Sequence, residues 1–133
     1  MFNTMILRYV TFGNHDWKGF TGPQHEYSAL SKRWTSPSNY YTILYTLNDK
    51  TRVKIIMIDS QVQCDWTENH VPNTMYPIYP TFEEKENQIT WLAKELENSR
   101  DDDYVFGVGH YQMHTSKEAK TCMTEIEDMI SNS

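Results

Sequence analysis

The sequence predicts an α/β domain, and three observations carry that prediction. Segments of strand-like composition alternate along the chain with segments of helical periodicity. Two of the strand-like segments, residues 5–12 and 104–109, are followed by polar side chains, as ligand-binding strands of α/β sheets often are. The length of 133 residues fits one domain of ordinary size, so we expect residues 1–133 to form a single domain.

The first half of the chain is predicted to hold a strand, a helix and a hairpin. Residues 5–12 are apolar and form the first strand, and aromatic and leucine residues on one side predict a helix over 24–34. Residues 40–47 and 52–59 are rich in β-branched and apolar side chains. The turn residues 48–50 lie between them, which predicts an antiparallel hairpin.

The second half is predicted to hold a long loop, two helices and one strand. Residues 61–81 lack a clear period and contain three prolines, which indicates a loop. Residues 82–100 form the strongest helix, followed by a solvated acidic turn at 101–103. A short buried strand is expected over 104–109 and a last helix over 117–130. The apolar stripe of the strongest helix consists of Ile89, Leu92, Ala93 and Leu96.

The charge and hydropathy of the chain exclude several classes of protein. Lys and Arg number 12 against 18 Asp and Glu, a net charge of -6, which argues against a nucleic-acid partner. No apolar run approaches the roughly 18 residues of a membrane-spanning helix. The first ten residues lack the charged start and the cleavage site of a signal peptide.

Two short motifs place groups with metal-binding and proton-transfer chemistry at strand ends. Gly13, Asn14, His15 and Asp16 follow the first strand, and His110 follows the strand over 104–109. Mixed amide-oxygen and imidazole ligands suit zinc, iron or manganese. Taken singly, each motif is more typical of a turn with a solvated histidine. The two cysteines are far apart in sequence, which leaves two buried thiols and one disulfide as alternatives.

Taken together and in order, these segments resemble a known family. The chain resembles the calcineurin-like metallophosphoesterases, and within them the purple acid phosphatase branch of the small, tartrate-resistant type. The matching segments are residues 8–16, 27–34, 58–60, 88–92 and 104–111. The resemblance implies a partial calcineurin-like phosphoesterase domain over residues 1–133. It would be part of an α/β/β/α sandwich that lacks its N-terminal and C-terminal strands.

The resemblance also implies a chemistry and a set of site residues. The family hydrolyses phosphomonoesters with metal-activated hydroxide at a dinuclear centre of iron with iron, zinc or manganese. Carried over to this chain, Asn14 and His110 bind metal and His15 is the general acid. Asp16 and Tyr111 match positions that support the site. The partner implied is a phosphate ester or phosphate.

The resemblance extends to the cysteines and the compartment. The small members of the family carry a disulfide at positions that match Cys64 and Cys122, and they are secreted or lysosomal. Trp17 stands where these enzymes commonly have a further histidine, and Gln112 stands where a proline is frequent. Of the other histidines, His25 and His70 are expected to be solvated, and His114 is a minor candidate to reach a phosphate from its loop.

The same comparison leaves a second hypothesis open. The family's site is built from about five sequence blocks, and this chain contains two of them, with two metal ligands. Catalytic zinc sites usually have three protein ligands and a water molecule. A truncated chain or a pseudoenzyme with an incomplete dinuclear site and no catalysis is therefore the alternative to a working phosphatase.

Overall fold

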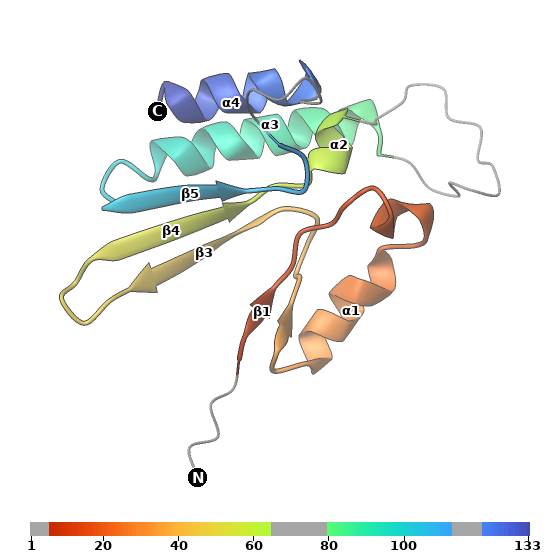
Figure 1. Cartoon of the computed structure of the whole chain (residues 1–133), viewed down its shortest axis with the longest axis horizontal. Coiled ribbons are helices and arrows are strands. Elements are labelled where there is room, and N and C mark those ends of the chain that lie inside the picture. The colour runs from red at the N-terminus through yellow and green to blue at the C-terminus, as the bar shows by residue number, and fades with distance from the viewer. Residues whose placement is uncertain (1–5, 65–79, 113–120) are drawn as a thin grey trace, which may run out of the picture.

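The computed structural model describes residues 6–64, 80–112 and 121–133, which form two small sheets and the helices beside them (Figure 1). In the smaller sheet, β1 (Arg8–Tyr9) pairs in parallel with β2 (Trp34–Thr35). The mixed α/β class is therefore confirmed. The two sheets lie side by side, and the chain passes from the smaller to the larger after β2.

The larger sheet has the strand order β3-β4-β5. β3 (Tyr41–Thr46) and β4 (Arg52–Met57) are antiparallel, which confirms the predicted hairpin. β5 (Tyr104–Val108) is parallel to β4. Parallel neighbours need a long crossover connection, and the chain between β4 and β5 supplies it with helices.

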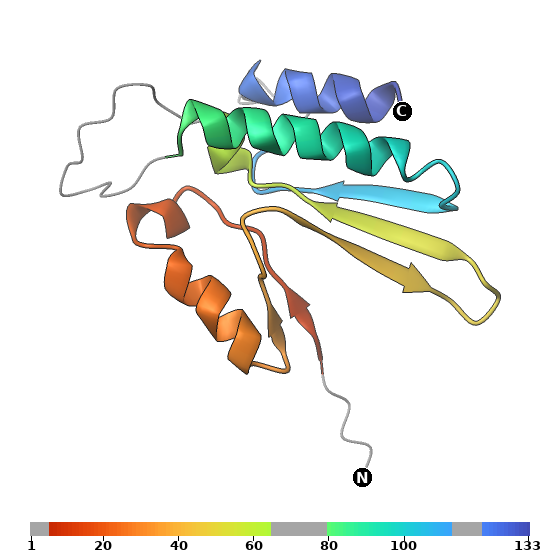
Figure 2. The ribbon, with the colours of Figure 1, turned by 180° about the vertical axis from the view of Figure 1, so that it is seen from behind.

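One face of the larger sheet is covered by α3 (Phe82–Glu97), with α4 (Thr124–Ser131) beside it (Figures 1 and 2). Ile56 of β4 packs against Leu92 and Leu96 of α3 in the main core. The predicted helix over 82–100 is confirmed at its start and ends three residues earlier. Among the described residues, no helix is both long enough and apolar enough to cross a membrane.

The start of α3 is fixed by a reciprocal cap. The Thr81 hydroxyl accepts a hydrogen bond from the Glu84 amide at 3.1 Å, and the Glu84 carboxylate accepts one from the Thr81 amide at 2.7 Å. This capping box satisfies two amides that the helix itself cannot satisfy. It explains why the helix begins at Phe82.

A short helix, α2 (Ser60–Cys64), occupies the beginning of the segment that was predicted to be a loop. The Asp59 carboxylate accepts hydrogen bonds from the amides of Gln61 and Val62, at 2.9 and 3.2 Å, and so caps the helix. The loop prediction is therefore wrong for residues 61–64. Residues 65–79 of that loop and residues 117–120 of the predicted last helix lie outside the described part of the chain.

A disulfide between Cys64 and Cys122 joins the end of α2 to η2 (Thr121–Met123), the turn of 3-10 helix before α4. It encloses a sequence separation of 58 residues. Of the two alternatives for the cysteines, the disulfide is the one the structure contains. The bridge fastens α4 and α2 on the same side of the larger sheet.

The amino-terminal elements are shorter than predicted. The first strand is limited to Arg8 and Tyr9, and α1 (Gly22–Leu30) ends before Trp34, which belongs to β2. The helix ends because the Ser31 hydroxyl accepts hydrogen bonds from the amides of Arg33 and Trp34, at 3.1 and 3.0 Å. Serine competes in this way with helical backbone bonds.

β5 is exposed, so the prediction of a buried strand is wrong. Tyr104, Phe106 and Val108 are 58, 53 and 37% exposed. Their register beside β4 places them on the sheet face away from α3, and among the described elements none covers that face at β5. The composition of β5 is typical of a buried strand, but in the described structure one of its faces is uncovered.

The acidic turn was predicted to be solvated, and this is wrong for Asp102. Its side chain is fully buried and lies 2.8 Å from the Arg52 guanidinium and 3.5 Å from the Lys54 ammonium. Lys54 is itself buried and also lies 3.5 Å from the Glu95 carboxylate. The cations project from β4 on the helix-covered side, where a buried charge requires a partner of opposite sign.

Candidate metal and phosphate site

The two motifs, more than ninety residues apart in sequence, meet in space. An idealised β-carbon on Gly13 would lie 2.9 Å from three ring atoms of His110. Real β-carbons essentially never come so close to another heavy atom. The imidazole of His110 therefore lies directly against the backbone of the Gly13 turn, in space that only glycine leaves open. This contact agrees with the prediction that the residues after the two strands, at Gly13 and at His110, face one site.

The turn that carries Asn14 and His15 is closed by Asp16. Its carboxylate accepts a hydrogen bond from the Gly13 amide at 2.9 Å and another from the Gln24 side-chain amide at 3.2 Å. The Asp16 amide in turn donates to the Gly13 carbonyl at 3.0 Å. These bonds tie the turn to itself and to α1. Asn14 is left half-buried and His15 exposed, so the imidazole of His15 faces solvent.

The buried carboxylate of Asp59 holds the turn in place through Trp17. Trp17, in the turn of 3-10 helix η1 (Asp16–Lys18), donates its ring N–H to Asp59 at 3.0 Å, and both residues are buried. Burial raises the pKa of the Asp59 carboxyl from 3.8 to about 7, with a smaller contribution from the negative charge of Glu84. The N–H donors of Trp17, Val62 and Gln61 oppose that rise.

The backbone of Asp59 is held separately from its side chain. The Gln88 side chain accepts from the Asp59 amide at 2.9 Å and donates to the Asp59 carbonyl at 3.0 Å. Gln88 is fully buried in α3. The helix therefore fixes the end of β4, and that end fixes Trp17. Sequence reasoning gave Asp59 no role; its signal was a carboxylate directly after an apolar strand.

Tyr111 holds the other half of the site. Its hydroxyl donates to the Gln61 side-chain oxygen at 2.8 Å, and its amide donates to the Ser60 hydroxyl at 3.0 Å. Its ring lies 5.1 Å from the ring of His110, centroid to centroid. These contacts anchor the residue next to His110 on α2. The segment after β5 is thus fastened beside the Gly13 turn.

The donor set near the turn is small. Asn14 offers an amide oxygen, and His15 and His110 offer imidazole nitrogens. Within residues 6–64, 80–112 and 121–133, no group of three or more His, Cys, Asp or Glu side chains is arranged to hold a metal ion. The described residues therefore do not fit a complete dinuclear centre, which needs more ligands than they bring together.

His25 was expected to be solvated, and the structure corrects this. It lies in α1, half-buried, with one ring nitrogen 2.7 Å from the Ser36 carbonyl and the other 2.9 Å from the Asn39 side-chain oxygen. Its ring packs against Phe12. It therefore serves to join α1 to the turn after β2. His70 and His114 lie outside the described residues.

Comparisons with known proteins relate this chain to acid phosphatases. No protein-family model matches the chain. Over 112 residues the chain is 34% identical to tartrate-resistant acid phosphatase type 5 of Rattus norvegicus and 33% identical to that of Homo sapiens. These alignments cover 83% of this chain and 33 and 34% of the relatives, so the chain spans about a third of their length.

A solved structure gives the same answer for the fold. GAP50, described as the anchor in the inner membrane complex of Plasmodium, superposes with a TM-score of 0.62 over 92% of this chain and 38% of its own. The sequences are 18% identical, so this likeness concerns the fold alone. By homology over 112 residues, the chain is a relative of the tartrate-resistant acid phosphatases.

Proposed function

We propose that this chain carries one half of an acid-phosphatase site, acting on phosphomonoesters. The observation that carries the proposal is the contact between the Gly13 turn and the ring of His110. That contact places an amide oxygen, an exposed imidazole and a second imidazole around one strand-end turn. The homology to acid phosphatases gives this arrangement its substrate class.

Each residue of the half-site has a distinct role in this proposal. Asn14 and His110 are the metal-binding donors, and the described residues around them do not complete the iron, zinc or manganese centre of the relatives. His15 is the general acid, because its imidazole is exposed next to the metal-binding donor Asn14 and an imidazole can supply a proton to a leaving oxygen. Asp16 and Tyr111 hold the two halves in place.

The proposal extends to the domain and its compartment. Residues 1–133 form one partial calcineurin-like phosphoesterase domain. The disulfide between Cys64 and Cys122 supports maturation in an oxidising compartment, since disulfides are rare in reducing ones. Together with the homology, this supports a secreted or lysosomal location.

A second candidate function is a fold-related chain without catalysis. The donor set favours it, because the described residues bring together too few ligands for a dinuclear site. Such a chain would bind phosphate or a single metal ion weakly through Asn14, His15 and His110. The two candidates differ in what happens after binding, and a hydrolysis assay separates them.

The test is hydrolysis of p-nitrophenyl phosphate by the purified chain after reconstitution with iron and zinc. The phosphatase proposal predicts turnover that falls about 10²–10⁴-fold in His15→Gln, the usual contribution of a general acid. Lys94→Gln, at an exposed position of α3, is the control and should leave turnover unchanged. Turnover that is indifferent to His15→Gln and His110→Gln contradicts the proposal, and metal binding without turnover supports the second candidate.

A further inference from the structure

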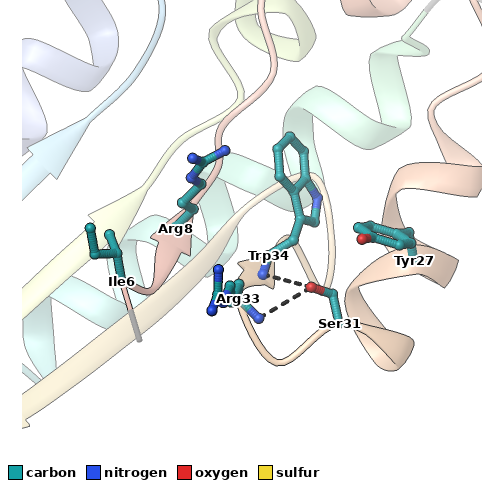
Figure 3. Close-up of a pocket in the computed structure, with 6 residues that line it drawn as sticks. All are labelled: Ile6, Arg8, Tyr27, Ser31, Arg33 and Trp34. Carbon is teal, nitrogen blue, oxygen red and sulfur yellow. Dashed lines mark hydrogen bonds between the residues drawn. The ribbon is translucent and has the colours of Figure 1, made fainter. Parts of the chain in front are cut away.

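A cavity of about 330 Å³ opens between β1, β2 and α1, at the end of β1 opposite to the Gly13 turn (Figures 1 and 3). It lies apart from the half-site, because β1 runs away from the cavity towards that turn. Two arginines, two aromatic residues, a serine and an isoleucine line it. They are Ile6, Arg8, Tyr27, Ser31, Arg33 and Trp34.

The two arginines are notable in an acidic chain. Arg8 and Arg33 are both exposed, and neither guanidinium lies in an ion pair with a described residue. Arg52, in contrast, is paired with Asp102. The chain has a net charge of -6 and therefore more carboxylates than cations. Even so, no carboxylate is among the described residues that line this cavity with Arg8 and Arg33. Guanidiniums that line one cavity and have no carboxylate partner attract an anion.

The backbone holds both arginines in fixed positions. The Arg8 amide donates to the Arg33 carbonyl at 2.7 Å, and Arg8 is the register partner of Trp34 across the two strands. The Ser31 hydroxyl accepts from the amides of Arg33 and Trp34 (Figure 3). The guanidiniums therefore project from a cross-linked backbone, which lowers the ordering cost of binding.

Trp34 adds an unsatisfied donor and a flat surface. Its ring nitrogen is buried and has no hydrogen-bond partner among the described residues. Figure 3 shows this nitrogen on the side of the indole that faces Tyr27. A buried N–H without an acceptor costs free energy, which a ligand oxygen would recover. The indole and the Tyr27 ring offer apolar faces on which a second ring can stack.

We propose that this cavity binds an aromatic phosphate monoester, with the phosphate on Arg8 and Arg33 and the aromatic ring beside Trp34 and Tyr27. Phosphotyrosine, free or in a peptide, has this chemistry. Two guanidiniums suit the phosphate oxygens, and the cavity volume accommodates a single ring but not a large ligand. The site is independent of the proposed hydrolysis at the Gly13 turn.

The test is calorimetric titration of the whole chain with phenyl phosphate, inorganic phosphate and phenol. Phenyl phosphate is expected to bind at least about tenfold more tightly than inorganic phosphate, because only it engages the rings. Arg8→Gln and Arg33→Gln should each weaken phenyl phosphate about tenfold, the effect of one charge-assisted contact. Arg100→Gln, an exposed arginine outside the cavity, is the matched control and should change nothing. Melting curves of each variant establish that it is folded.

Further variants separate this site from the half-site. Trp34→Phe keeps a ring and removes the donor, so phenyl phosphate should weaken while phenol does not. His110→Ala should leave binding to the cavity intact, even if the phosphatase proposal fails. Binding that is lost in His110→Ala, unchanged in both cavity-arginine variants, or reduced equally by Arg100→Gln overturns the proposal. A phosphotyrosine peptide that binds more tightly than free phosphotyrosine identifies a peptide as the source of the ligand.

Discussion

The ring of His110 lies against Gly13, so closely that a β-carbon at position 13 would come within 2.9 Å of three ring atoms. This contact brings together two strand ends that are more than ninety residues apart in the sequence. The proposed site therefore depends on a residue that itself has no side chain.

Gly13→Ala is expected to disturb both folding and the site. The added methyl group must displace His110 or the turn, and overpacking of this kind costs about 1–3 kcal/mol. Urea unfolding monitored by tryptophan fluorescence measures the loss. Gly19→Ala is the matched control, because its β-carbon would meet only the Asp16 carbonyl oxygen, at 3.8 Å. Equal stability of the two variants would show that position 13 is not crowded.

Asp59 is expected to make stability depend on pH. Its carboxyl pKa rises from 3.8 to about 7 on folding, chiefly because of burial, so the folded chain holds the proton more tightly than the unfolded chain. The contribution is complete below about pH 4 and is lost as the pH rises through about 7. Stability should fall across this window in the wild type.

The variant Asp59→Asn tests whether this pH dependence of stability comes from the Asp59 carboxyl. The asparagine side chain keeps an oxygen that can accept the Trp17 N–H but cannot titrate. The difference in unfolding free energy between wild type and variant should therefore change between about pH 4 and 7, and be constant above it. A difference that is constant over the whole range would place the folded-state pKa of Asp59 near its ordinary value.

Loss of the disulfide is expected to destabilise the chain strongly. For the separation of 58 residues between Cys64 and Cys122, the chain-entropy relation gives about 4 kcal/mol at 25 °C. Cys122→Ser paired with Cys64→Ser measures it without leaving a free thiol. The wild type with a reducing agent should melt at the temperature of this double variant. If reduction leaves the melting temperature unchanged, the bridge does not form in solution.

The charge of Asp102 is expected to be essential for packing at the end of β5. Asp102→Asn removes the carboxylate that faces Arg52 and buried Lys54, and because Lys54 keeps Glu95, the cost should lie at the low end of the range of about 3–5 kcal/mol for breaking a buried pair. Asp101→Asn, at the exposed neighbouring position, should cost almost nothing. Thermal unfolding of the two variants side by side checks this. Similar losses of stability in the two variants would contradict a special role for the buried ion pairs of Asp102.

Local pattern was enough to predict the elements whose signals are local. The hairpin of β3 and β4 follows from two β-rich runs around a turn, and α3 follows from a period of apolar residues. The Gly13 turn meets His110, as the polar residues at the two strand ends predict, although β1 and β5 belong to different sheets and share no edge. Fold class and candidate site therefore rest on a small number of motifs.

The misses share a physical cause, which is that burial depends on partners far away in sequence. Tyr104 and Phe106 have the composition of a core strand, but in the described structure nothing covers their face of the sheet. Asp102 belongs to an acidic segment typical of a surface turn, but its side chain is buried beside Lys54, with which it forms an ion pair. The role of Asp59 depends on Trp17, 42 residues away. None of these partners is visible in a local window.

The most direct test of the account is a zinc titration followed by nuclear magnetic resonance. If the two motifs form one binding site, the imidazole signals of His110 and the side-chain amide signals of Asn14 should shift together, with one apparent affinity. Asn14→Ala should weaken the response of His110, and His110→Ala that of Asn14. Signals that shift independently, or a His110 response that is unchanged in Asn14→Ala, would contradict the claim that they share a metal site.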